Sequence, residues 1–183
     1  MHVASVSESE IRITLEAVVD VANGLIDDDL DLRPLLAERG FSRSTGASIA
    51  SMQRAEQRMS ELLPFMRQLP DLDADTAARR VNEELTELPI TPSIVDHNHV
   101  GPHIHWTPPT AKFDDQLLAD FLMALAQELC DNGTIRFGRC DAEDCDRLFY
   151  DATRNRSKRF CSDPRCASRT HTADHRARRR AAG

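Results

Sequence analysis

CDAEDC at residues 140–145 and CSDPRC at residues 161–166 are two cysteine pairs with matched four-residue gaps, separated by fifteen residues. Each tight turn brings two thiolates to one side of the chain, and Zn²⁺ accepts four sulfur ligands in a tetrahedron. The spacing therefore predicts one structural Zn²⁺ on Cys140, Cys145, Cys161 and Cys166. Four sulfur ligands leave no open position for a catalytic water, so the metal is expected to support folding.

The residues after the second pair predict a basic helix. Ser162 or Asp163 can cap its start, and Pro164 suits its first turn. The fifteen residues between the pairs have about the length of a β-hairpin. The predicted unit is a knuckle, a hairpin and a helix whose first turn supplies the last ligand, which is a treble-clef-like zinc finger.

This segment resembles the CGNR zinc-finger family. The resemblance rests on RNRSKRFCS at residues 154–162, then Cys166 and Arg169, and the arginine-rich helix. It implies an ABATE-like α/β body over residues 1–135, a CGNR-like zinc finger over residues 136–183, and a bacterial, stress-related transcription regulator that binds DNA. The family motif Cys-Gly-Asn-Arg stands here as Cys166-Ala167-Ser168-Arg169.

Charge divides the chain into an acidic and a basic part. The net charge of −7 is the sum of two opposite parts. Residues 136–183 contain 13 Lys and Arg and 7 Asp and Glu, a formal charge of +6, and residues 1–135 have a formal charge of −13. This asymmetry is typical of a protein in which the tail alone meets phosphate. The residues predicted to contact nucleic acid are Arg154, Arg156, Lys158, Arg159, Arg165, Arg169, Arg176, Arg178, Arg179 and Arg180.

Two other interpretations of the basic tail stay open. The arginines could pair with the acidic body of the same chain, or they could grip an acidic protein partner while the zinc knuckle docks on it. DNA is the preferred partner because the family resemblance favours it.

The N-terminal part predicts a mostly helical body, and the fold class is α+β. Helices are expected over residues 8–24, from Pro34 to Gly40, from Ser44 or Thr45 to Pro64, over 74–87 and over 113–130. The last of these carries a wide apolar stripe, expected to bury against the body's own sheet, with a homodimer contact as the alternative. Cys130 at its end is expected to be a small buried hydrophobe. The acidic run at residues 27–29 is interpreted as a solvated loop, with a metal site as the less favoured alternative.

Residues 90–95 and 104–107 predict two strands around a turn that is rich in histidine. His103 and His105 would share one strand face, as would His97 and His99 if the extension continues. These four residues are a candidate secondary metal or ligand site, because imidazole suits zinc, copper or nickel. The alternative is a polar strand face that packs around Trp106.

Other classes of protein are disfavoured. The sequence has no apolar run of eighteen residues and no N-terminal signal segment, so a cytoplasmic protein without a membrane partner is expected. Reduced thiols in that compartment favour metal over disulfides. No nucleophile–base pair or phosphate loop names a reaction, so an enzyme is not expected. A small-molecule effector or a homodimer contact is assigned to the N-terminal body.

Overall fold

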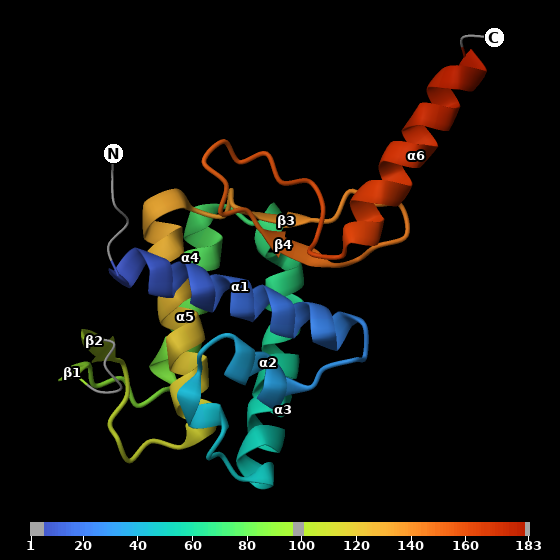
Figure 1. Cartoon of the computed structure of the whole chain (residues 1–183). Coiled ribbons are helices and arrows are strands. Elements are labelled where there is room, and N and C mark those ends of the chain that lie inside the picture. The colour runs from blue at the N-terminus through green and yellow to red at the C-terminus, as the bar shows by residue number, and fades with distance from the viewer. Residues whose placement is uncertain (1–5, 97–100, 182–183) are drawn as a thin grey trace.

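A central helix, α5 (Phe113–Asn132), organises the helical part of the chain. In the computed structural model, which describes residues 6–96 and 101–181, α5 packs against α1 (Val6–Ile26), α3 (Ile49–Gln68) and α4 (Ala74–Thr86), as Figure 1 shows. The shorter elements between these helices are α2 (Leu32–Glu38) and the 3-10 turns η1 (Ser42–Ser44) and η2 (Leu69–Asp71).

The apolar stripe of α5 is buried against helices. Phe121, Leu122 and Leu125 are fully buried, and the rings of Phe121 and Phe41 pack in a T-shaped arrangement at a centroid distance of 5.7 Å. The expectation that a sheet covers this stripe is wrong. Both strand pairs are too short to span a twenty-residue helix, and α1, α3 and α4 supply the apolar surface instead. By contrast Cys130, which was expected to be buried, is exposed near the end of α5.

Local capping explains where the other helices begin. Ser48 accepts a hydrogen bond from the backbone N–H of Ser51 at 3.1 Å, so α3 starts at Ile49, later than predicted. The predicted break at Pro64 is also wrong, since α3 runs through it to Gln68. Proline inside a helix costs about 3 kcal/mol. Burial of the side chains around it offsets that cost, and these are Leu62, Phe65 and Met66.

Two antiparallel strand pairs lie outside the helices. The first joins β1 (Ser93–Asp96) to β2 (Pro102–His105), about two residues from the predicted positions. The second joins β3 (Phe137–Arg139) to β4 (Leu148–Tyr150). This second pair encloses the first cysteine pair. The hairpin predicted between the two cysteine pairs is therefore wrong, because a loop over residues 151–160 takes its place.

The second strand pair is docked on the helical body. Phe137, Leu148 and Tyr150 belong to the same buried cluster as the helix side chains. The Tyr150 hydroxyl donates to Glu128 Oε2 of α5 at 3.0 Å. Two ion pairs also join the ends of this strand pair to the helical body, from Arg147 to Asp27 and from Arg139 to Asp71.

The expected α+β class is confirmed. The chain is mostly helical, has two small antiparallel strand pairs, and carries a cysteine cluster in its C-terminal region. Within residues 6–96 and 101–181, none of the helices is both long and apolar enough to cross a membrane.

Candidate metal centre and basic surface

The first cysteine pair lies in the turn between β3 and β4. The backbone N–H of Cys140 donates to Arg147 O at 2.9 Å, and that of Cys145 donates to Ala142 O at 3.1 Å, which folds the turn tightly. Gly138 permits this strand pairing, because a Cβ at this position would lie 2.4 Å from the ring of Phe149 on the opposite strand.

The second cysteine pair lies at the start of α6 (Pro164–Ala181). Asp163 Oδ1 accepts from the backbone N–H of Arg165 at 2.9 Å, and Asp163 O accepts from that of Cys166 at 3.1 Å. These bonds start the helix one residue after Asp163 and place Cys166 in its first turn, as the sequence predicted. A hydrogen bond from Asp141 N to Arg159 O at 2.9 Å joins the two halves of the site.

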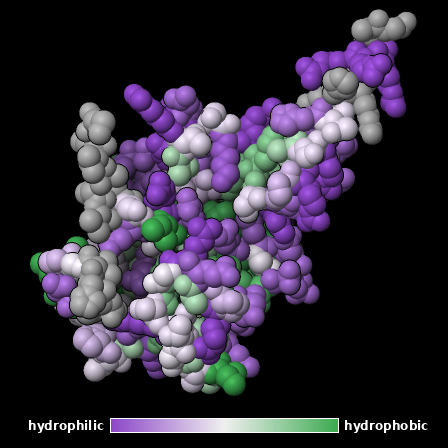
Figure 2. All heavy atoms as spheres, viewed as in Figure 1, coloured by the Kyte–Doolittle hydropathy of each residue, from purple (hydrophilic) through white to green (hydrophobic). Residues whose placement is uncertain are grey.

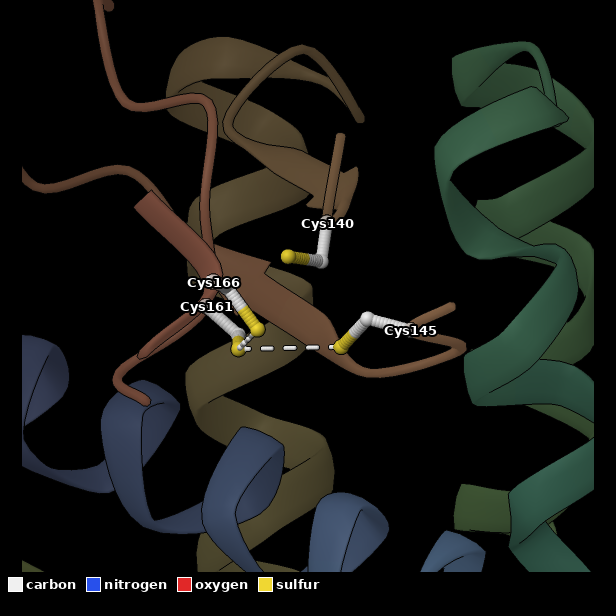
Figure 3. A group of neighbouring side chains, drawn as sticks. All are labelled: Cys140, Cys145, Cys161 and Cys166. Carbon is white, nitrogen blue, oxygen red and sulfur yellow. Dashed lines mark hydrogen bonds between the residues drawn. The ribbon is translucent and has the colours of Figure 1, made fainter. Parts of the chain in front are cut away.

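The four sulfur atoms converge on one point, as Figure 3 shows. All Sγ atoms lie within 4.8 Å of one another, with Cys145 and Cys161 at 3.9 Å and Cys161 and Cys166 at 3.7 Å. A tetrahedral Zn²⁺ with Zn–S bonds of about 2.3 Å places its sulfurs about 3.8 Å apart. None of the four is in a disulfide. The donor set and its spacing fit one structural Zn²⁺, confirming the predicted cofactor.

The thiol pKa values show what the metal must overcome. Burial raises the pKa of Cys145 to about 12 and raises that of Cys161, and the neighbouring sulfurs add to both effects. Burial also raises the pKa of Cys140, but hydrogen bonds from the backbone N–H groups of Cys161 and Ala142 and from the thiols of Cys145 and Cys161 together leave a net lowering. A bound Zn²⁺ holds its thiol ligands deprotonated, so metal binding releases protons and weakens as pH falls.

The basic residues predicted to contact nucleic acid fall into two groups. The first group contacts neighbouring groups within the finger. These pairs are Arg159 with Asp141, Arg165 with Asp163, Lys158 with the carbonyl of Tyr150, and Arg169 with Cys166 Sγ. Arg165 holds the pKa of Asp163 well below its usual range. Exposed ion pairs contribute little to stability, so Arg159 and Arg165 can exchange their partners for phosphate at little cost.

The second group lies on exposed segments of the finger. Arg154 and Arg156 are exposed in the loop over residues 151–160, and Arg178, Arg179 and Arg180 are exposed in the last turn of α6. Figure 1 shows that α6 leaves the body and projects into solvent, and Figure 2 shows hydrophilic surface over its projecting end. The side chain of Arg176 lies outside the described part of the structure.

A buried carboxylate that the sequence did not single out shapes the basic loop. Asp151 is 3% exposed. Its Oδ1 accepts from the backbone N–H and the hydroxyl of Thr153 at 2.8 and 2.6 Å, and its Oδ2 accepts from the backbone N–H of Lys158 at 2.8 Å. The loop between these bonds carries Arg154 and Arg156, the latter at a positive φ of 49°. The sequence signal that could have identified Asp151 is an acidic residue at the end of a strand, just before a basic segment.

The structure brings together two of the four histidines of the candidate secondary site. His103 Nε2 lies 3.2 Å from His105 Nε2, and His103 Nδ1 lies 2.9 Å from Gly101 O. Arg43 Nη2 donates to His105 Nδ1 at 2.6 Å, and Asp120 of α5 interacts electrostatically with both Arg43 and His103. His97 and His99 lie outside the described residues. Ligand or metal binding here stays a prediction.

Comparison with known proteins identifies the C-terminal segment. Residues 136–179 match the family model described as CGNR zinc finger, which confirms the resemblance over these residues. The match covers β3, β4, the cysteine cluster and most of α6. No curated protein matched the chain. The Ala167-Ser168 pair, which replaces the Gly-Asn of the family motif, lies within α6, where alanine favours the helix by about 1 kcal/mol over glycine.

Proposed function

We propose that this chain is a DNA-binding transcription regulator whose structural zinc folds a basic finger. The observation that carries the proposal is the position of the exposed arginines. They lie on a zinc finger, on a loop and a helix end that both project from the acidic body. DNA phosphates attract such a surface, and the acidic body cannot approach the same phosphates.

The zinc knuckle itself is expected to face away from DNA. Asp141, Glu143 and Asp144 are exposed in the turn between the first two cysteines, and their charge repels phosphate. The projecting part of α6 is then the element that enters a groove or follows the backbone. Its terminal arginines spread around the helix at about 100° per residue, so only some contact a single groove.

The residues of the body, 1–135, are proposed to regulate the finger. The support for this role is the packing of α1 against β4, together with the ion pair between Asp27 and Arg147, which adjoin these two elements. A ligand or a second copy of this chain that moved α1 would therefore also displace β4, which packs against α1, and so act on the finger.

Binding of the zinc-loaded full chain to labelled duplex DNA tests the proposed function. Fluorescence anisotropy would be measured over a series of salt concentrations starting at about 50 mM. We expect log affinity to fall linearly with log salt, by about 0.9 per phosphate neutralised. Replacing Arg154 and Arg156 by Gln, or Arg179 and Arg180 by Gln, should each lower the slope by up to about 1.8, since two charges are removed.

The matched control removes two exposed arginines of the body, Arg12→Gln with Arg67→Gln, and should leave the slope unchanged. Failure of the zinc-loaded protein to bind duplex DNA at the lowest salt would refute the proposal. Tighter binding to single-stranded RNA of the same length would refute the DNA assignment.

A further inference from the structure

The four zinc ligands differ in the groups that stabilise the charge on their sulfurs. Four thiolates and one Zn²⁺ carry a formal charge of about −2, which needs hydrogen-bond donors around it. Three of the sulfurs have backbone donors from the turns. Cys140 accepts from the N–H groups of Cys161 and Ala142, Cys145 from that of Arg147, and Cys161 from that of Asp163.

Cys166 is in a different position because it lies in the first turn of α6. The first four N–H groups of a helix have no carbonyl partner within the helix, so they are also available to a sulfur at this position. Cys166 is also only 1% exposed, which keeps water from solvating its sulfur. A charged sulfur removed from water in this way is stabilised most strongly by a donor on a charged side chain.

Arg169 supplies that donor. It follows Cys166 by three residues, which puts both side chains on the same face of α6. Its Nη2 lies 3.6 Å from Cys166 Sγ, within range for a hydrogen bond to sulfur. The guanidinium cannot be deprotonated and has several donors in a fixed plane, which suits a buried anion.

We infer that Arg169 is a positioning residue of the zinc centre, which holds and neutralises the Cys166 thiolate, and that this is its main role. From the sequence, Arg169 is expected to contact nucleic acid together with the other arginines of the helix. The inference rests on the zinc site alone and does not depend on the proposed DNA binding. Partners of this kind typically change metal affinity by about 10–100-fold when they are removed.

Zinc affinity of the full chain, measured by competition with a chelating dye, tests the inference. Arg169→Gln should weaken zinc binding about 10–100-fold, because a neutral amide stabilises the thiolate less. Arg169→Lys keeps the charge but has a compact ammonium group in place of the planar guanidinium, and should retain part of the zinc affinity. Arg179→Gln removes the same charge from the exposed end of α6 and should bind zinc as the unaltered chain does.

Cobalt substitution separates this role from a general loss of folding. The sulfur-to-cobalt charge-transfer band reports the electron density on the thiolates. It should shift to lower energy in Arg169→Gln, return toward its original position in Arg169→Lys, and stay unchanged in Arg179→Gln. Equal zinc affinity and an unshifted cobalt band in Arg169→Gln would overturn the inference, whatever the DNA measurements show.

Discussion

The side-chain amide of Asn23 in α1 is hydrogen-bonded at both ends to the backbone of Leu148 in β4. Asn23 Nδ2 donates to Leu148 O at 3.0 Å, and Leu148 N donates to Asn23 Oδ1 at 2.7 Å. Asn23 is 6% exposed and 125 residues distant in the chain. One polar side chain of the body thus completes the hydrogen bonding of a strand that follows the first cysteine pair.

Replacing Asn23 by Ala should loosen the strand pair from the body. It leaves the N–H and C=O of Leu148 buried and unpaired, which costs about 1–3 kcal/mol. Hydrogen exchange over residues 137–150 should accelerate, while exchange in α5 should change less. Asn82→Ala, at an exposed position of α4, is the matched control. Unchanged exchange in residues 137–150 would mean that the amide contributes nothing to docking.

Replacing Cys161 by Ser should abolish zinc binding without unfolding the body. The metal site lies in a small cluster of its own, separate from the helical core, so loss of the ion removes folding energy from the finger alone. Metal analysis should find one zinc in the unaltered chain and none in the variant, and circular dichroism should retain most of the helix signal. Cys130→Ser, at an exposed cysteine outside the cluster, should keep one zinc. Full zinc content in Cys161→Ser would contradict the site.

Replacing Asp151 by Ala should open the basic loop. The carboxylate accepts bonds from Thr153 and Lys158, and without it these part-buried donors lose a charged acceptor, at a cost of about 1–3 kcal/mol. Trypsin cleaves after Arg and Lys, so limited digestion within residues 154–159 should become roughly tenfold faster or more. Asp144→Ala removes an exposed carboxylate from the knuckle and serves as the control. Equal cleavage rates in the two variants would show that Asp151 does not hold the loop.

Asp120 should make stability depend on pH. Burial raises its pKa from 3.8 to about 6, against the opposing charges of Arg43 and His103. A carboxyl with a raised pKa in the folded state stabilises the fold below its unfolded pKa, and this contribution is lost as pH rises through about 6. Asp120→Asn should therefore be more stable than the unaltered chain at about pH 7.5, by on the order of 1–2 kcal/mol, and the gap should shrink at about pH 5.

Urea unfolding of the zinc-loaded proteins at the two pH values measures this gap, because the pH dependence of zinc binding is common to both and cancels. Asp131→Asn, at an exposed position of the same helix, is the control and should show no comparable gap. A gap that grows toward acidic pH would contradict the assignment.

Sequence reasoning succeeded where the pattern is local. The cysteine spacing places four thiols around one ion, and a capping aspartate with a proline starts a helix at any point of a chain. It failed where distant elements compete. The expected break at Pro64 depended on proline's local cost, which the packing of Phe65 and Met66 outweighs. The prediction of a hairpin between the cysteine pairs was wrong because β4 pairs with β3, which lies upstream of the first cysteine.

The sequence by itself determined the zinc ligands, the charge division and the existence of the long helices, because each depends on spacing or composition within a short segment. Tertiary structure alone decided which arginines have internal partners, how Asp151 shapes the basic loop, and that Asn23 completes the hydrogen bonding of Leu148. These relationships join groups by their distance in space. Separation along the chain, which is 125 residues for Asn23 and Leu148, carries no information about such contacts.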